Sequence, residues 1–345
     1  MPETASSIRT LAAQLGLSRT TVSDALRNAP WVSTDTARRV QAAAEEAGYK
    51  LNPLASAVMS HLRQGRGRSF LGVLAAVNLD DQERSPAAMR FHHALVAGAQ
   101  QRAEELGFKL QPFHVGKKGV TLHRLDTILQ SRGIQGILLL PAWQAADFSG
   151  LDWSRYAGVY TDYVIDRPAL HVVCSDHYRS MIGVLQRLHA RGYGRVGLFM
   201  ERHLDERLQY RWASAFTIYQ RNHPELGKVP PLIKESIRRD AFVEWFKKHK
   251  PDVVLGHSAD AVDWMEACGA RVPETHGFVC LNVLMQDRVC AGLDLQPHLL
   301  GARGIEQVIA QLQRNERGIP GAATTTMLAA QWRDGPTLPV VNGKG

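Results

Sequence analysis

Cysteine and histidine, the side chains most often used for covalent or metal chemistry, lack motif spacing in this chain. The four cysteines form no CxxC pair and accompany no plausible set of histidine ligands; they are Cys174, Cys268, Cys280 and Cys290. We expect them to be small buried hydrophobes in a reducing compartment. The adjacent His92 and His93 are expected on a helix, without a metal. No P-loop, GxGxxG after a strand, GxSxG or HExxH motif occurs, so we expect no enzyme, no catalytic residue, no metal and no cofactor.

Positive charge is the second chemical feature, and it gathers near the N-terminus. The chain has 345 residues and a formal net charge of +8. Residues 1–68 carry +4 of that charge, from nine basic and five acidic residues. The basic residues are Arg9, Arg19, Arg27, Arg38, Arg39, Lys50, Arg63, Arg66 and Arg68. This balance fits a domain that binds nucleic acid, although a basic chain also suits an anionic ligand.

Three short helices are predicted around this charge. Apolar residues at helical spacing predict a first helix over 8–15, which Gly16 ends. Ser18 is placed to cap a second helix and Ser33 a third, which Gly48 closes. A tight turn with glycine between two short helices is typical of a helix-turn-helix. A basic linker over 49–69 follows, with a short helix predicted over 54–62.

Strands and helices are predicted to alternate through the rest of the chain. We expect strands over 70–77, 110–115, 136–140, 158–161, 172–174, 196–200, 253–255 and 278–281, and helices over 91–106, 122–132, 177–191, 207–222, 240–248, 259–268 and 300–314. This alternation predicts parallel sheets with helices on both faces. The strands are too many for one sheet of usual size, so we expect two lobes with a ligand between them.

The first thirty residues contain no signal peptide and no apolar run is long enough to span a bilayer, so we expect a cytoplasmic protein.

The first fifty residues resemble the lactose-repressor (LacI/GalR) family of transcriptional regulators. The residues that match the family pattern in register are Leu11-Ala12, Gly16-Leu17-Ser18, Thr21-Val22-Ser23, Leu26, Asn28, Val32-Ser33, Thr36, Arg39-Val40, Gly48-Tyr49 and Asn52-Pro53. A looser resemblance continues to about residue 335. It includes Arg191-Gly192-Tyr193, Pro251-Asp252-Val253-Val254 and Gly318-Ile319-Pro320.

The resemblance implies an all-α helix-turn-helix head over 1–50 and a hinge helix with linker over 51–69. A two-lobed α/β sensor of the periplasmic-binding-protein type would occupy 70–340. Lobe 1 would comprise about 70–164 and 294–324, and lobe 2 about 165–293 and 325–340. The chain would therefore cross between the lobes near residues 165, 294 and 325. The family also implies a homodimer on a pseudo-palindromic operator in double-stranded DNA.

The family's DNA contacts map onto the head and the hinge. Arg19 suits a guanine edge and Thr20 a thymine methyl group. Asp24 departs from the arginine found in many members, and either orients Arg19 or contacts a base. The residues expected at phosphates are Thr21, Ser23, Asn28, Ser33 and Tyr49, although Ser33 is also a plain helix cap. In the hinge, which includes Asn52 and Ala55, Val58 or Met59 would wedge into the minor groove, unless both only pack against the dimer partner.

The family's effector contacts map onto the sensor. Arg211 opens a segment like the family's "R..GF", where an arginine grips the ligand; the alternative is a salt bridge. Asn282 replaces a family aspartate, and His257 with Ser258 stands where many members have "ND". The other candidates for the pocket are Asn78, Phe91, Trp143, Asp162 and Asp294, of which Phe91 and Trp143 fit the core equally well.

The sequence thus predicts a DNA-binding transcriptional regulator, expected to be a repressor, that responds to a small molecule, expected to be a sugar. Two alternatives are a sugar-binding protein without DNA activity and an α/β enzyme. The DNA-reading head argues against the first, and the missing catalytic motifs argue against the second. The sequence leaves open the effector, the operator, and whether the ligand induces or co-represses.

Overall fold

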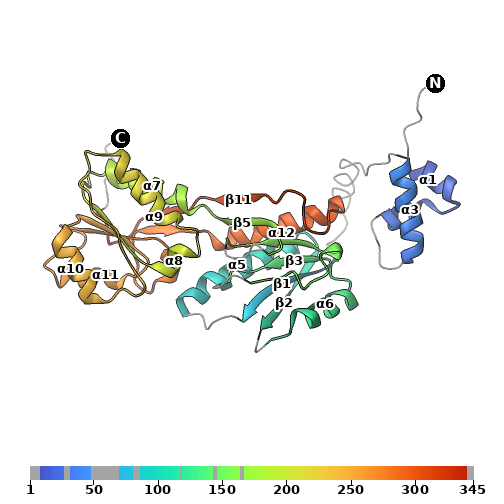
Figure 1. Cartoon of the computed structure of the whole chain (residues 1–345), viewed down its shortest axis with the longest axis horizontal. Helices are drawn as coiled ribbons and strands as arrows, with labels where there is room; N and C mark the ends of the chain where they lie inside the picture. The colour runs from blue at the N-terminus through green and yellow to red at the C-terminus, as the bar shows by residue number, and fades with distance from the viewer. Residues whose placement is uncertain are drawn as a thin grey trace, which may run out of the picture.

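The structure is a computed structural model, which describes residues 8–26, 32–47, 70–80, 86–116, 119–142, 146–163 and 167–339. A helical head is followed by two α/β lobes, each built on one sheet (Figure 1). Among the described residues, no helix is long and apolar enough to cross a membrane.

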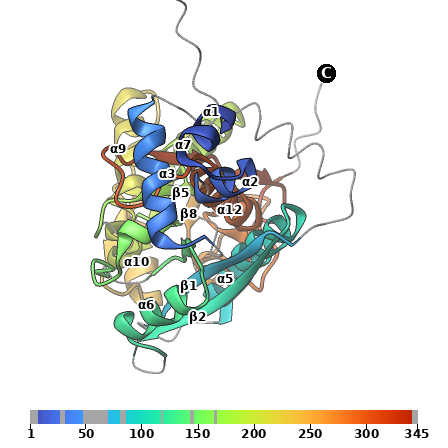
Figure 2. The same ribbon diagram turned by 90° about the vertical axis from the view of Figure 1, so that its right-hand side faces the viewer.

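The head consists of α1 (Ile8–Leu15), α2 (Arg19–Leu26) and α3 (Thr34–Glu46), which Figure 2 shows grouped together. Its own small core comprises Leu11, Ala12, Val22, Ala25, Leu26, Val40, Ala43 and Ala44. Between α1 and α2, Gly16 has a φ of +66°, a left-handed conformation that glycine adopts without a side-chain clash. The Oγ atoms of Ser18 and Ser33 accept hydrogen bonds from the Thr21 and Thr36 amides, at 3.0 and 3.2 Å. The predicted turn and both predicted caps are therefore confirmed.

The first lobe contains a six-stranded parallel sheet in the order β11-β5-β4-β3-β1-β2. Its strands are β1 (Gly72–Asp80), β2 (Phe108–Gly116), β3 (Gly136–Leu139), β4 (Ala157–Tyr160), β5 (His171–Ser175) and β11 (Thr325–Leu328). Helices α5 (Pro86–Glu105) and α12 (Pro297–Arg314) pack on one face, and α6 (Leu122–Ser131) with the 3-10 turn η1 (Trp153–Arg155) on the other. Successive residues of β3 alternate between these two cores, because neighbouring side chains of a strand point to opposite faces.

Helices α5 and α12 approach each other at backbone distance. A Cβ on Gly98 would lie 1.9 Å from the carbonyl oxygen of His298, and one on Gly301 would lie 1.9 Å from that of Leu95. Only a residue without a side chain fits at these two positions. The contact fixes α12 on the first lobe, although β10 before it belongs to the second.

The second lobe contains a six-stranded sheet in the order β12-β10-β9-β8-β6-β7, in which β12 alone runs antiparallel to its neighbour. Its strands are β6 (Val196–Glu201), β7 (Leu232–Lys234), β8 (Val253–Gly256), β9 (Gly277–Cys280), β10 (Gly292–Asp294) and β12 (Gln331–Arg333). Helices α7 (His177–Ala190) and α9 (Arg211–Asn222) cover one face, and α10 (Arg239–His249) and α11 (Asp260–Glu266) cover the other. Helix α8 (Arg202–Glu206) and the 3-10 turn η2 (Val283–Met285) complete the lobe.

Two of the three crossings between the lobes, the first and the third, lie later in the chain than expected. The first crossing is expected near residue 165, but β5 pairs with β4, so residues 171–175 still belong to the first lobe. Similarly, β11 pairs with β5, so residues 325–328 belong to the first lobe and not to the second. The boundaries at 165 and 325 are therefore corrected to about 176 and 329.

Hydrogen bonds tie the three crossing segments together. The Asp176 amide donates to the Leu328 carbonyl at 2.7 Å, and the Ala330 amide donates to Ser180 Oγ at 2.9 Å. The side chain of Gln296, in the second crossing, donates to the Ala329 carbonyl at 2.8 Å. Hydrogen bonds therefore connect the three segments that cross between the lobes, and these segments lie next to the space between the lobes.

Candidate functional site

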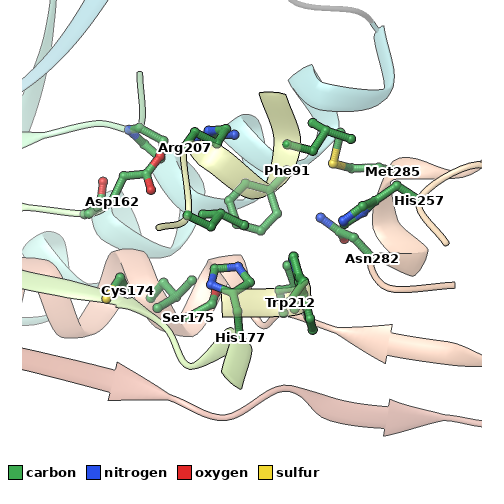
Figure 3. Close-up of a pocket in the computed structure, with 16 residues that line it drawn as sticks. Phe91, Asp162, Cys174, Ser175, His177, Arg207, Trp212, His257, Asn282 and Met285 are labelled. Atoms are coloured by element: carbon green, nitrogen blue, oxygen red, sulfur yellow. Dashed lines mark hydrogen bonds and ion pairs between the residues drawn. The ribbon is translucent and has the colours of Figure 1, made fainter. Parts of the chain in front are cut away.

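A cavity lies between the lobes, where the carboxyl ends of strands from both sheets meet. Its volume is about 110 Å³, or about 730 Å³ when the space open to solvent is counted. Loops after β3, β4 and β5 form one wall, and loops after β8, β9 and β10 form the other. Its lining residues include Phe91, Asp162, Ser175, His177, Arg207, Trp212, His257, Asn282 and Met285 (Figure 3).

An ion pair between Asp162 and Arg207 joins the lobes at one side of this cavity. Asp162 follows β4 of the first lobe, and Arg207 follows α8 of the second. Arg207 also donates to the Ala142 carbonyl at 3.1 Å. Figure 3 shows this pair on the side of the cavity opposite His257 and Asn282. The carboxylate of Asp162 is therefore already matched by a positive charge.

A second connection between the lobes comes from Arg90 on α5. Its Nε donates to the Leu284 carbonyl at 2.9 Å, and its Nη1 pairs with Asp287 at 2.9 Å. Asp287 is almost fully exposed, so this ion pair itself contributes little. The bond to the η2 backbone, however, gives the lobes a second point of contact away from Arg207.

Two buried histidines of the second lobe line the cavity: His177 at the start of α7 and His257 after β8. Burial lowers the pKa of His177 to about 3, aided by the nearby His257, Arg207 and Arg211. Burial also lowers the pKa of His257 to about 4, with Arg207 and His203 acting in the same direction. Both imidazoles are therefore neutral at physiological pH, and each offers one donor and one acceptor.

Four buried polar atoms on uncharged side chains of the cavity lining have no hydrogen-bond partner among the described residues. They are His177 Nδ1, Trp212 Nε1, His257 Nε2 and Asn282 Oδ1. Buried polar groups are normally paired, so each such atom calls for an explanation. His177 packs edge-on against Trp212, with ring centroids 4.9 Å apart, and Trp212 lies 6.0 Å from His257. The unpartnered atoms thus belong to one continuous group of side chains.

The local structure explains why Trp212 is held at this place. Asp205 accepts hydrogen bonds from the Trp212 and Ala213 amides, at 3.1 and 3.4 Å, and so satisfies the start of α9. On the other side, the Gln286 side chain donates to the His257 carbonyl at 2.6 Å. These bonds fix the backbone behind the cavity and leave the side chains directed into it.

The structure brings four of the predicted effector residues to this cavity: Phe91, Asp162, His257 and Asn282. It places four others elsewhere. Arg211 stacks over the ring of Tyr163 at 4.3 Å and bonds to Gln209 at 3.2 Å. Asp294 pairs with Arg333 at 2.8 Å.

The remaining predicted effector residues are also away from the lining. Asn78 lies on β1, with its side chain 3.4 Å from His114. Ser258 Oγ accepts from the Asp260 amide at 3.3 Å. Trp143 lies outside the described residues. Ligand contact by the four lining residues remains a prediction.

The lining residues that the sequence analysis missed include His177, Arg207 and Trp212. His177 comes two residues after the strand predicted over 172–174, and the rule that ligands meet strand ends could have found it. Trp212 directly follows Arg211 in the family-like segment. Arg207 had no signal of its own, because its role depends on the turn between α8 and α9.

The predicted DNA contacts are only partly described. Arg19, Thr20 and Ser23 lie on α2, but their side chains are not described. Thr21 shares a 2.8 Å hydrogen bond with Ser18, and Asp24 is also on α2. Ser33 is the N-cap of α3. The predicted residues outside the described range are Asn28, Tyr49, Asn52, Ala55, Val58 and Met59.

Comparison with known proteins agrees with this architecture. Residues 7–52 match the model of the bacterial regulatory proteins of the lacI family, and this range contains α1, α2 and α3. Maltose regulon regulatory protein MalI of Escherichia coli is 31% identical over 140 residues, which are 41% of this chain and 37% of MalI. HTH-type transcriptional regulator Rv3575c of Mycobacterium tuberculosis is 36% identical over 240 residues, which are 69% of this chain and 56% of that protein. The matches therefore span about a third to a half of these relatives.

Solved structures share the whole fold. The transcriptional regulator CelR–cellobiose complex has a TM-score of 0.55 and 18% identity, covering 96% of this chain and 99% of that one. The lac repressor dimer bound to operator and the anti-inducer ONPF has a TM-score of 0.56 and 16% identity, covering 97% and 100%. The expected order of a helix-turn-helix head before a two-lobed α/β domain is confirmed. Residues 7–52 are therefore a DNA-binding head of the lacI family of bacterial regulatory proteins, and the chain as a whole shares the fold of the lac repressor.

Proposed function

We propose that this protein is a homodimeric, sequence-specific DNA-binding transcriptional repressor whose operator affinity is controlled by a sugar or sugar derivative. The observation that carries the proposal is the pairing of two parts in one chain. One is a lacI-family head with a glycine turn between α1 and α2 and serine caps on α2 and α3. The other is a cavity between two lobes with unpartnered polar atoms. A protein that acts on DNA in this way works in the cytoplasm, and no enzymatic step is needed.

For DNA binding, α2 is the helix that enters the major groove in this proposal. Ser18 Oγ caps the start of α2 by accepting a hydrogen bond from the Thr21 amide. Arg19 and Thr20 stand there, and their chemistry suits base edges. A homodimer would present two such helices to a pseudo-palindromic operator, as the solved lac repressor dimer is bound to an operator.

For the effector, the cavity favours an uncharged ligand with several hydroxyl groups. Neutral His177 and His257, the Trp212 N–H and the Asn282 carbonyl offer a mixture of donors and acceptors. A hydroxyl both donates and accepts, so a sugar can satisfy such a mixed set. The one lining carboxylate, on Asp162, is already paired with Arg207, which leaves no free charge for an ionic ligand. Phe91 and Trp212 supply apolar surface for the sugar ring.

The two sites would communicate through the lobes. A ligand that closes the lobes changes the positions of the segments that lead to the head. The linker helix predicted over 54–62 is too short to be stable alone, so its formation would depend on this spacing. The coupling must be reciprocal: if the sugar weakens operator binding, the operator weakens sugar binding by the same factor.

Two measurements on the full-length protein test the proposal. Selection from random duplex DNA should yield a pseudo-palindromic site, bound with a steep salt dependence. Arg19→Ala should weaken binding to that site by about 1–3 kcal/mol and relax its specificity at one base step. Arg132→Ala, an exposed arginine at the end of α6, is the matched control and should change nothing. Equal losses on selected and random DNA would show that Arg19 contacts only phosphate.

The effector is identified by a thermal-shift screen of neutral mono- and disaccharides, with their acidic and phosphorylated counterparts included. A neutral sugar at about 100 times its dissociation constant should stabilise the protein by about 2.7 kcal/mol. The same sugar should change operator affinity. A response confined to acidic or phosphorylated compounds would contradict the assignment of an uncharged ligand.

A further inference from the structure

His189, His223 and Glu225 form a three-residue cluster on the second lobe, away from the cavity. Their ligand atoms all lie within 4.8 Å of one another. His223 Nδ1 is 2.9 Å from Glu225 Oε1, and His189 Nε2 is 3.9 Å from the same oxygen. The side chains of His189, His223 and Glu225 are 38%, 35% and 52% exposed, so a dissolved ion can reach all three.

These distances agree with the requirements of a zinc-sized ion. Tetrahedral Zn²⁺ binds imidazole nitrogen and carboxylate oxygen at about 2.0–2.2 Å, which places neighbouring ligand atoms about 3.3–3.5 Å apart. The two separations that include Glu225 lie within about half an ångström of this value. The ligand atoms of His189 and His223 lie within 4.8 Å of each other, so a closer approach of the two rings would complete the geometry. Two histidines and one carboxylate leave a fourth position for water, and imidazole with carboxylate is a ligand set typical of Zn²⁺.

The backbone and one aromatic ring hold the ligands in place. His223 is the C-cap of α9, and its ring stacks on Tyr219 with centroids 4.1 Å apart. The Leu226 amide donates to the His223 carbonyl at 3.1 Å, which closes the turn that carries Glu225. His189 lies in the last turn of α7, where its carbonyl accepts from the Gly192 amide at 2.9 Å. The ligands therefore come from two helix ends whose positions are fixed before any ion binds.

We propose that His189, His223 and Glu225 bind one divalent transition-metal ion, best matched by Zn²⁺, which links the C-terminal ends of α7 and α9. The two histidines are 34 positions apart in the sequence, so no short sequence motif indicates the site. The helices lie side by side in Figure 1. Their opposite ends carry His177 and Trp212, which contact each other at the cavity. The ion would fix the spacing of the same helix pair that forms one wall of the cavity, and the site does not depend on the identity of the effector.

The test titrates Zn²⁺ alone into chelator-treated full-length protein and follows the heat of binding. The parent should bind one Zn²⁺ per chain at this site, and its melting temperature should rise. His189→Ala and His223→Ala should each weaken this binding about tenfold or more, since even outer partners of a metal site can have effects of that size. His123→Ala, which removes an exposed histidine on α6 of the first lobe, is the matched control and should bind like the parent.

A second variant separates an ion site from a purely structural contact. Glu225→Gln keeps an oxygen that can accept the hydrogen bond from His223 but removes the negative charge. The ion site predicts unchanged melting without metal, together with at least about tenfold weaker Zn²⁺ binding. Parent-like Zn²⁺ affinity in His189→Ala, His223→Ala and Glu225→Gln would overturn the proposal. So would binding by the parent that is no tighter than that of the His189→Ala and His223→Ala double variant.

Discussion

Asp162 and Arg207 form a largely buried ion pair that joins the two lobes, with side-chain exposures of 8% and 21%. Removing one partner of such a pair leaves a buried charge without compensation, which is more damaging than losing the attraction itself. We expect Arg207→Ala to lower the free energy of unfolding of the sensor domain by about 1–3 kcal/mol. Urea unfolding of the full-length protein, followed by tryptophan fluorescence, measures this change.

An exposed ion pair in the second lobe provides the control. Arg333 pairs with Asp294 at 2.8 Å, but the Arg333 side chain is 53% exposed. Arg333→Ala should therefore change stability by less than about 1 kcal/mol. If Arg207→Ala were no more destabilising than Arg333→Ala, the pair at the cavity would not hold the lobes together.

The neutral histidines of the cavity predict loss of stability at acidic pH. Burial keeps the pKa of His177 near 3 and that of His257 near 4 in the folded protein. An unperturbed histidine has a pKa of about 6.5. Between these values the unfolded chain binds more protons than the folded one, so stability falls as the pH falls. The full contribution is present above about pH 6.5, and each histidine adds a slope of up to about 1.4 kcal/mol per pH unit below it.

Urea unfolding at several pH values between 7.5 and 4.5 measures this slope. His177→Gln and His257→Gln should each reduce the slope of the free energy of unfolding against pH by up to about 1.4 kcal/mol per pH unit. His123→Gln, at an exposed site, should leave the curve unchanged. A parent whose stability is level from pH 7 to pH 5 would show that these imidazoles are protonated in the folded state.

Most of the fold follows from local patterns that a sequence displays directly. The strand over 253–256 is a continuous apolar run, and it is buried on both faces as a central parallel strand requires. In the head, Ser18, Gly16 and Ser33 carry out the capping and turn roles that their residue types indicate. These features depend on neighbours close in the chain, and for that reason they can be predicted.

Features that depend on tertiary neighbours could not be predicted in this way. The strand β11 has mostly exposed side chains at the edge of its sheet, so no apolar run marks it. In the head, Ala43 and Ala44 of α3 are buried, whereas Ala47, directly after the last residue of α3, is exposed. The exchange of Arg211 for Arg207 at the cavity follows from the turn between α8 and α9. There Gln209 and Tyr210 have positive φ angles, which sequence pattern alone did not indicate.

The close approach of α5 and α12 makes a prediction about glycine. A Cβ on Gly301 would overlap the Leu95 carbonyl oxygen at 1.9 Å, and this backbone cannot move aside without separating the helices. Gly301→Ala should therefore destabilise the protein by about 1–3 kcal/mol. Gly183 lies on α7 with an exposed, open position, so Gly183→Ala should stabilise by up to about 1 kcal/mol. Opposite signs for these two variants in urea unfolding are the expected result, and stabilisation by both would contradict the helix contact.

Trp212 and Trp153 provide a matched pair for the cavity. Both rings are buried, but Trp153 Nε1 donates to the Phe148 carbonyl at 2.9 Å, whereas Trp212 Nε1 has no partner within the described structure. Replacement by phenylalanine removes a similar volume at each site. Only Trp153→Phe also removes a buried hydrogen bond, although the Phe148 carbonyl keeps its bond from the Leu151 amide. Trp153→Phe should therefore be more destabilising than Trp212→Phe by about 0.5–1.5 kcal/mol.

For ligand binding we expect the opposite ranking: Trp212→Phe should lose sugar affinity, and Trp153→Phe should not. If Trp212 Nε1 donates to a hydroxyl group of the sugar, Trp212→Phe should weaken binding of the sugar identified by thermal shift about fivefold or more. Trp153 is the first residue of η1 and lies in the core of the first lobe. Trp153→Phe should therefore bind that sugar like the parent. Calorimetry on both variants decides between the two possibilities. Parent-like affinity in Trp212→Phe would mean that its indole N–H does not face the ligand, and the other unpartnered atoms, His177 Nδ1, His257 Nε2 and Asn282 Oδ1, would then have to account for recognition.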